Sequence, residues 1–438
     1  METTPKIRPR ERDAIIQSLK AGVTPRTGLQ HIQVGRVREV ESLLKDIDRI
    51  VDGGTAFRMI IGDFGSGKSF FLHLIRMIAL EKGLVTLHAD LTPERRLYGT
   101  GGLARNLYAE LMRNCSTRTK ADGGALTSIV ERFISEARQD AEKNSREVSA
   151  VIESRLKSLT EYVGGYDFSK VVGAYWKAYE SGDEDLKASA VQWLRGEFAN
   201  KTEAKKALGV PTIVEDKNMY DTLKLLSLFV VQCGYKGLWV SLDEMVNLYK
   251  IANKVSRTSN YEQLLKILND CLQGQSSHIG FLFCGTPDFL MDPRKGLYSY
   301  DALKSRLSEN TFAEAAGVTD YSGTILHLPA LTPEELLVLL KNIRRVFASG
   351  EDETGLLPDE ALLAFLNHCA NVLGEAYFRT PRNTIKAFVD MLSVLEQNPT
   401  LKWSDLVAKI EVPKETNSDM PQVEKGGGED SALSTFEL

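Results

Sequence analysis

The chain has 438 residues, of which 43% are hydrophobic and 26% are charged, as in an ordinary globular protein. A chain of this length is too long for one small core and fits about two or three domains. The formal net charge of −5 argues against a surface coated in positive charge for nucleic acid, although a local basic stripe is compatible with it.

Sequence patterns argue against several further classes of protein. No apolar run approaches the roughly 20 residues that cross a bilayer. The first residues, METTPKIRPRERD, lack the apolar core of a signal peptide. The five cysteines form no Cys-x-x-Cys pair, which favours scattered buried thiols over a metal or redox site. We therefore expect a cytoplasmic protein without membrane contact.

Residues 1–30 form a polar N-terminal arm that carries a basic cluster. The cluster consists of Lys6, Arg8, Arg10 and Arg12. We interpret it as the solvated start of a helix, and the alternative is an arm that contacts phosphate. Beyond the arm, apolar residues recur at helical spacing from Val40 to Ile50, and Gly53-Gly54 ends that helix.

The next stretch alternates strand and helix patterns. The buried-strand run FRMII leads into the loop GDFGSGKS, which is followed by the helix FFLHLIRMIALEKG and the strand LVTLHAD. This order is a βαβ unit, so it predicts a parallel sheet with a right-handed crossover.

Long helical patterns then replace the strands, and the sheet resumes later. Strand runs return as KGLWVSLDE, HIGFLFCGT and TILHLP. Thr332 and Glu335 have the spacing of a capping box at the start of a further helix. The end of the chain is polar and rich in glycine, which indicates disorder. The predicted organisation is an α/β core at 31–101 and 226–330, a helical insertion at 102–225, a helical lid at 331–415 and a disordered tail at 416–438.

The loop GDFGSGKS fits the pattern G-x-x-x-x-G-K-[ST] and lies between a strand and a helix, the context that this phosphate-binding motif requires. Its glycines let backbone N–H groups curl around phosphates at the positive end of the helix. Lys68 supplies a charge for the β and γ oxygens of ATP, and the Ser69 hydroxyl is a Mg²⁺ ligand. The predicted phosphate-binding residues are Gly62, Asp63, Phe64, Gly65, Ser66, Gly67, Lys68, Ser69 and Phe70.

The strand run LWVSL ends in two acids, Asp243 and Glu244. Charges at the carboxyl end of a parallel strand face the crevice where α/β sheets bind ligands. Together with the phosphate loop, this placement predicts that Asp243 holds Mg²⁺ and that Glu244 polarises the attacking water. The second acid favours hydrolysis over simple binding.

Three further polar residues are candidates for the same site. Thr286 ends the strand GFLFCGT and could contact water or the γ-phosphate, although a plain strand-end threonine explains it equally well. Arg306 follows that strand; a surface ion pair is one interpretation of it, and the resemblance of these motifs to AAA+ rings implies the other, an arginine that reaches a neighbouring subunit's γ-phosphate. Arg382 opens a helix, where a cation opposes the helix dipole unless a phosphate is near; Arg379 is its competitor.

These motifs together resemble the Orc/Cdc6-like branch of the AAA+ ATPases. The resemblance begins at Val34, Gly35 and Arg36, which look like that branch's VGRxxE motif near the adenine, and it continues through the phosphate loop and the two later strands. More narrowly, GDFGSGKSFFL and AGVTPRTGLQHIQVGR resemble the ATP-binding proteins of BREX-type phage-resistance loci, the BrxD/BrxC-related family. The resemblance implies ATP and Mg²⁺ as ligands and a helicase or methyltransferase encoded nearby.

Two departures from that branch limit the expectation. Lys68 and Asp243 are separated by much more chain than a compact AAA+ core needs, and the extra length is the helical insertion. An Orc/Cdc6 initiator carries a winged-helix domain after its lid, and we find no stretch for one, so we expect only weak DNA contact. The predicted function is ATP hydrolysis coupled to conformational change, as a regulatory or motor subunit of a DNA-linked defence or processing assembly. We also expect self-association into a ring or filament. The alternatives are an ATP-gated scaffold with little turnover and a loader ATPase for transposition or replication.

Overall fold

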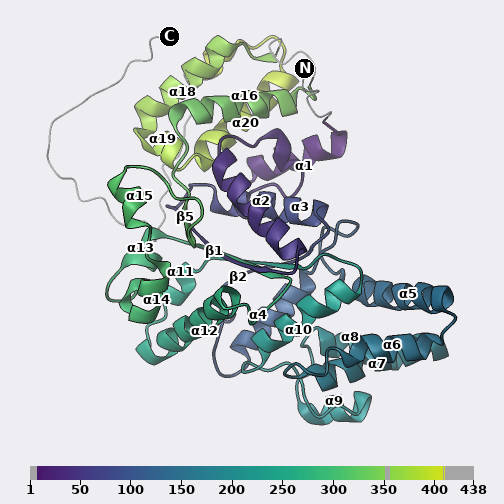
Figure 1. Ribbon diagram of the computed structural model, residues 1–438. Coiled ribbons are helices and arrows are strands. Elements are labelled where there is room, and N and C mark those ends of the chain that lie inside the picture. Colours follow the sequence, from purple (N-terminus) through teal and green to yellow (C-terminus); the bar gives the residue numbers. More distant parts are fainter. Residues whose placement is uncertain (1–6, 351–355, 408, 410–438) are drawn as a thin grey trace.

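The computed structural model describes residues 7–350, 356–407 and 409. Its centre is a sheet of five strands in the order β2-β3-β4-β1-β5, and all of the neighbouring strands are parallel (Figure 1). The parallel arrangement confirms the α/β fold that the βαβ pattern predicted. The strands are β1 (Thr55–Ile61), β2 (Val85–Asp90), β3 (Leu238–Asp243), β4 (Ile279–Gly285) and β5 (Ile325–His327).

Helices cover both faces of the sheet, which is why the central strands are continuous apolar runs. Alternate residues of β1 point to opposite sides: Met59 belongs to the larger apolar cluster and Ile60 to the smaller one. On the side of Ile60 lie α2 (Val37–Val51) and α3 (Lys68–Glu81). On the side of Met59 lie α4 (Leu103–Arg113), α10 (Met219–Gln232) and α12 (Lys254–Leu272).

The stretch between β2 and β3 is helical, and its inner part lies directly on the sheet. Its apolar side chains join the larger cluster of the core, so these helices extend that core outward (Figure 1). The outer helices are α5 (Leu126–Asn144), α6 (Val148–Lys157), α7 (Gly165–Ser181), α8 (Glu184–Leu194) and α9 (Lys201–Leu208). None of the described helices is both long and apolar enough to cross a membrane.

Short helices follow the carboxyl ends of β3 and β4. Those after β4 connect the sheet to the segment that enters β5. They are α11 (Val246–Tyr249), α13 (Pro287–Met291), the 3₁₀ turn η2 (Leu297–Ser299), α14 (Asp301–Leu307) and α15 (Thr311–Ala315).

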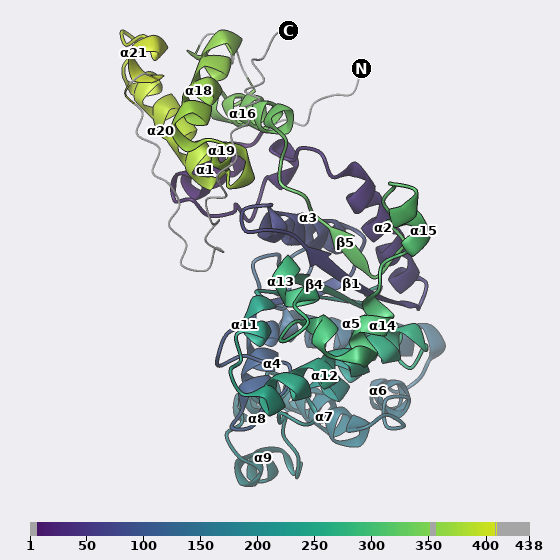
Figure 2. The same ribbon diagram turned by 90° about the vertical axis from the view of Figure 1, so that its left-hand side faces the viewer.

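A separate helical cluster, here called the lid, lies beyond β5 (Figure 2). Its first helix begins with the predicted capping box, in which Thr332 and Glu335 bond reciprocally to backbone N–H groups. The tail predicted at 416–438 lies outside the described residues. The lid helices are α16 (Pro333–Phe347), α18 (Asp359–Leu373), α19 (Ala376–Arg379), α20 (Arg382–Gln397) and α21 (Trp403–Val407).

The N-terminal helix α1 (Pro9–Lys20) begins within the basic cluster, as expected, and it packs on the lid through its apolar face, which the sequence did not predict. Ile15, Ile16 and Leu19 lie on one face of α1 and are buried in the lid cluster. Arg12 donates to the Phe347 carbonyl oxygen at 2.8 Å and to Glu396 at 3.0 Å. Arg8 and Arg10 are exposed as expected, and Lys6 lies outside the described residues.

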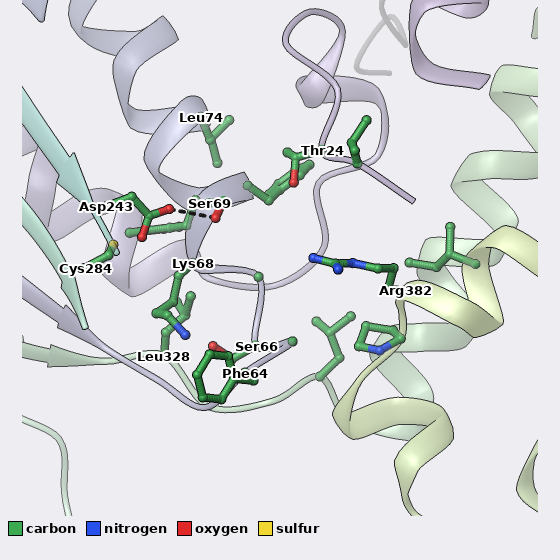
Figure 3. A pocket seen from close by; sticks show the side chains of 18 of the residues that line it. Thr24, Phe64, Ser66, Lys68, Ser69, Leu74, Asp243, Cys284, Leu328 and Arg382 are labelled. Atoms are coloured by element: carbon green, nitrogen blue, oxygen red, sulfur yellow. Dashed lines mark hydrogen bonds between the residues drawn. The ribbon is translucent and has the colours of Figure 1, made fainter. Parts of the chain in front are cut away.

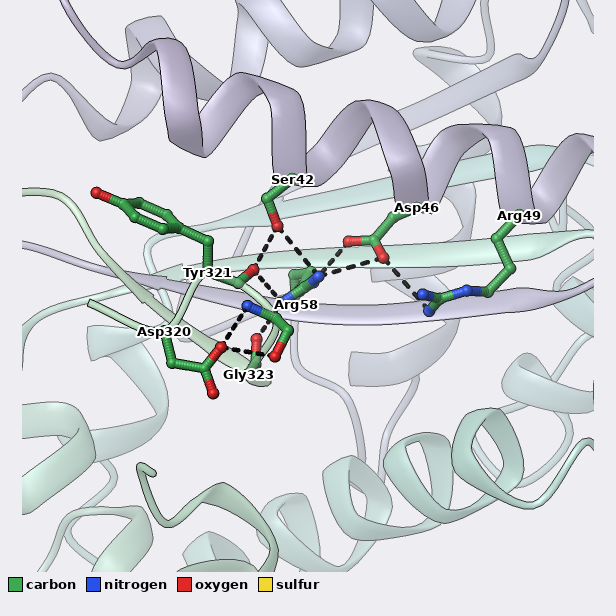
Figure 4. Close-up of polar contacts among 8 residues, drawn as sticks. Ser42, Asp46, Arg49, Arg58, Asp320, Tyr321 and Gly323 are labelled. Carbon is green, nitrogen blue, oxygen red and sulfur yellow. Dashed lines mark hydrogen bonds and ion pairs between the residues drawn. The ribbon is translucent and has the colours of Figure 1, made fainter. Parts of the chain in front are cut away.

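A buried ion pair joins α2 to β1 just upstream of the phosphate loop (Figure 4). Arg58 donates to Asp46 at 2.5 Å, and the side chains are 7% and 1% exposed. Arg58 also donates to the carbonyl oxygens of Tyr321 and Gly323, and Ser42 donates to that of Tyr321. The network therefore joins the segment before β5 to both α2 and β1.

Candidate functional site

The loop between β1 and α3 has the backbone that the glycine pattern predicts. Gly67 precedes the first residue of α3 with φ +86°, a left-handed conformation that glycine adopts without strain. Gly62 is needed for a different reason: a Cβ there would lie 2.5 Å from Ser66 Oγ and 2.7 Å from the Leu328 carbonyl oxygen. The loop thus ends at the N-terminus of a 14-residue helix, a favourable position for an anion.

Lys68 lies within the loop with its ammonium group directed at the loop's own backbone. Its Nζ donates to the carbonyl oxygens of Gly62 and Asp63, both at 2.8 Å, and lies 5.6 Å from the centre of the Phe64 ring. Burial lowers the pKa of Lys68, and the nearby acids, Asp243 among them, raise it in opposition. A phosphate oxygen would therefore meet a partly desolvated cation, which strengthens the attraction.

The two residues predicted to hold Mg²⁺ are brought together from opposite sides of the insertion. Ser69 Oγ donates to Asp243 Oδ2 at 2.7 Å, and the Glu244 backbone N–H donates to Asp243 Oδ1 at 2.8 Å (Figure 3). Hydroxyl and carboxylate oxygens are the hard ligands that Mg²⁺ prefers alongside phosphate and water. The donor set therefore fits Mg²⁺ bound together with a nucleotide.

Glu244 follows β3 in a strained backbone conformation. Its φ is +57°, which is uncommon for a residue with a side chain and costs about 1–3 kcal/mol. Burial raises the pKa of Glu244, the charges of Asp243 and Asp90 raise it further, and Lys68 opposes them. A carboxylate whose pKa is raised in this way is typical of a general base.

Asp90 is a neighbour of these acids that our reading of the sequence missed. It ends β2 in register with Asp243 at the end of β3. Burial and the charge of Asp243 raise the pKa of Asp90. The signal was present in LVTLHAD, a buried strand that ends in an acid, as the later strand does.

Thr286 and Arg306 lie in different places relative to the site. Thr286 is 6% exposed and lines the cavity described below, where its hydroxyl accepts a hydrogen bond from Phe289 N at 3.4 Å and caps α13. Arg306 is exposed near the end of α14 and donates to the Ala302 carbonyl oxygen at 2.9 Å. It does not line the cavity of its own chain.

The two arginines near the start of α20 are separated by the structure. Arg382 lines the cavity, and its guanidinium is directed into it (Figure 3). Arg379 instead pairs with Glu375 at 2.7 Å on the surface. The geometry therefore favours Arg382 over its competitor as a ligand-facing residue.

The segment of Val34, Gly35 and Arg36 lies between the core and the lid. Val34 and Arg36 line the cavity, and Arg36 donates to the Pro329 carbonyl oxygen. Burial lowers the pKa of Arg36, while Glu335 raises it. A Cβ on Gly35 would collide with Glu335 Oε1, so the segment packs tightly against the start of α16.

All of these parts meet in a cavity of about 270 Å³ between the core and the lid (Figure 3). One end carries the phosphate loop, Asp243, Glu244 and Thr286. The other end is mostly apolar and comes from α1, the segment after it and the lid. Its lining includes Leu19, Val23, Pro25, Ile32, Leu339 and Ile385. The N-terminal contribution to this end was not predicted from the sequence.

A phosphate-binding loop on a parallel α/β sheet, with a serine and an acid joined beside its lysine, defines the class: a P-loop nucleoside-triphosphate-binding core. The particular family follows from comparison with family sequence models. The chain belongs to the family described as BREX system ATP-binding protein BrxC/D, whose model matches residues 7–411. Among curated proteins, no match was found. The predicted family is thereby confirmed, and the Orc/Cdc6-like branch stays a prediction.

Proposed function

We propose that this protein hydrolyses ATP with Mg²⁺ as an AAA+ ATPase of a DNA-linked phage-defence assembly. The observation that carries the proposal is the 2.7 Å hydrogen bond from Ser69 to Asp243, with Glu244 next in the chain. It joins a phosphate-loop hydroxyl, an acid for the metal and an acid for water within one cavity.

The roles of the residues follow from their positions. Lys68 and the backbone N–H groups at the start of α3 bind the β- and γ-phosphates. Ser69 and Asp243 would hold Mg²⁺, which would supply charge neutralisation at the phosphates. Glu244 orients a water and accepts its proton, and Thr286 at the end of the adjacent β4 lies where it could donate to that water. Arg382 approaches the phosphates from the lid.

A steady-state hydrolysis assay on the purified chain tests the proposal, with Lys68→Ala as the inactive variant. We expect turnover in the parent and none in the variant, because the phosphates lose their principal cation. The matched control is Lys82→Ala, which removes an exposed lysine paired with Asp48 at the other end of α3. Equal turnover in parent and Lys68→Ala would contradict the assignment.

The second candidate function is an ATP-gated scaffold that binds nucleotide with little turnover. It is favoured by the position of Arg306, which lies outside the cavity and so leaves the phosphates of its own chain to other cations. Under our proposal Arg306 completes the site of a neighbouring copy, which requires self-association in a ring or filament. The proposal also includes a helicase or methyltransferase partner from the same locus. It further includes weak contact with DNA and a cytoplasmic location.

A further inference from the structure

The N-terminal helix ends at the nucleotide cavity, and its last turn is closed by a glycine. Val23 N donates to the Ser18 carbonyl oxygen at 2.9 Å and Gly22 N to that of Leu19 at 3.0 Å, so the chain reverses at Gly22 with φ +70°. After the reversal, Val23 and its neighbour Thr24 line the cavity, as do Leu19 and Gly22 themselves. The end of α1 is therefore one wall of the site.

Gly22 lies against the stem of Arg382. A Cβ built on Gly22 would be 3.5 Å from Arg382 Cδ and 3.6 Å from Cγ, which is van der Waals contact. A side chain at this position would therefore lie against the arginine stem. From this stem the guanidinium of Arg382 extends into the cavity (Figure 3).

Electrostatics give the end of α1 a second effect on Arg382. It is the first residue of α20, and a cation at a helix N-terminus is disfavoured by the helix dipole. The C-terminal end of α1 is the opposite pole, and Gly22, which follows it, contacts the arginine stem. The dipole of α1 thus stabilises the Arg382 cation at a position that the dipole of α20 disfavours.

The position of α1 relative to α20 is fixed by packing. Ile15, Ile16 and Leu19 are buried in the same cluster as Phe388 and Leu392 of α20. Arg12 adds hydrogen bonds to Phe347 and Glu396 at the far end of α1. The apolar packing and the hydrogen bonds of Arg12 together therefore fix the contact between Gly22 and Arg382.

We propose that Gly22 is a positioning residue of the ATP site. Because it has no side chain, the stem of Arg382 lies across the end of α1, and its guanidinium is directed at the phosphates. The N-terminal segment is then part of the nucleotide-binding unit. This inference rests on the proposed function in one respect: it takes the phosphates of ATP as the anion that Arg382 meets.

Gly22→Asn tests the inference, because asparagine tolerates the left-handed conformation but adds a side chain toward Arg382. The matched control is Gly182→Asn at the end of α7, where φ is +72° and nothing lies within 4 Å of a built Cβ. The affinity for MgATP is measured by titration calorimetry, and the melting temperature of each variant is recorded alongside.

We expect Gly22→Asn to weaken ATP binding about tenfold, as Arg382→Ala does, because a charge-assisted hydrogen bond of about 1.5 kcal/mol is lost. Gly182→Asn should bind ATP as the parent does, although its melting temperature should change about as much as that of Gly22→Asn. The double variant Gly22→Asn/Arg382→Ala should bind no more weakly than Arg382→Ala alone, since both remove one interaction. Gly22→Ala, whose Cβ makes only ordinary contact, should weaken ATP binding less. It replaces Gly22→Asn in the test if that variant does not fold.

Two results would overturn the inference: parent-like binding by Gly22→Asn, or additive losses in the double variant. Either of them leaves the proposed function intact if Lys68→Ala still abolishes turnover. If neither Lys68→Ala nor Arg382→Ala changes ATP binding, the proposed site itself is wrong and the inference falls with it.

Discussion

The two ends of the cavity are built in different ways. The phosphate end consists of residues within a few positions of two strand termini, so that Lys68, Ser69, Asp243 and Glu244 are placed by local backbone geometry. The apolar end is assembled from α1, from the segment after it and from lid helices far along the chain. The positions of the phosphate-end residues thus follow from local backbone geometry, whereas enclosure of the nucleotide depends on packing between distant segments.

The largest effect is expected at Arg306, which under the proposed function completes the phosphate end of a neighbouring copy of the chain. Arg306→Ala should lower turnover about 10³-fold or more, because an arginine that stabilises transition-state charge in trans has this value. Mixing Arg306→Ala with Lys68→Ala should restore activity, since some interfaces then pair an intact loop with an intact arginine. Turnover per protomer should also rise with protein concentration in the parent.

No rescue on mixing, together with a rate that is independent of concentration, would return Arg306 to the role of a surface cation. The matched control is Lys304→Ala on the same helix. A partner protein could supply the arginine in its place, so the mixing is repeated with the candidate partner present.

Glu244→Gln separates binding from chemistry within the phosphate end. Turnover should fall by about 10²-fold or more, because general-base catalysis contributes at least this much, while ATP binding is retained. Radiolabelled ATP that remains bound after filtration measures the trapped state. Parent-like hydrolysis by this variant would show that another group activates the water.

Asp46→Ala tests the support beneath the core side of the cavity. It leaves the buried Arg58 without its acidic partner, and we expect the free energy of unfolding to fall by about 3–5 kcal/mol. Asp48→Ala on the same helix is the control, because its pair with Lys82 is exposed and is worth about 0–1 kcal/mol. Denaturant titration measures both variants, and equal losses would contradict the assigned role of the buried pair.

Arg12→Ala tests the lid side and should give the smallest effect. It removes two hydrogen bonds that hold α1 to the lid and touches no residue of the cavity. We expect a loss of about 1 kcal/mol in stability and at most about a fivefold loss in ATP affinity. Arg10→Ala is the control because Arg10 is exposed on the same helix. Hydrogen exchange of α1 amides, faster only in the first variant, checks the cause.

The same contrast explains what the sequence could and could not predict. The strand–loop–helix order and the paired acids are local patterns, so the sheet and the meeting of Ser69 with Asp243 could be inferred from them. The burial of Ile15 and Ile16 depends on lid helices more than 300 residues away, and no local sequence pattern indicates that α1 packs on them. Asp90 was missed although its strand repeats the pattern of Asp243. Its nearness to Glu244 follows from the pairing of β2 with β3, which the sequence leaves open.

The division of the apolar interior has a calorimetric consequence. The sheet carries one apolar cluster on each face, while α1 and the lid form a third, and the cavity lies between the sheet and the lid. A ligand bound there contacts both the core and the lid and is lost when either unfolds. Saturating nucleotide should therefore raise the melting temperatures of both and bring two overlapping heat-absorption peaks toward one, by an amount set by its concentration relative to Kd. The nucleotide would then act as the cooperative link between two otherwise separable folding units.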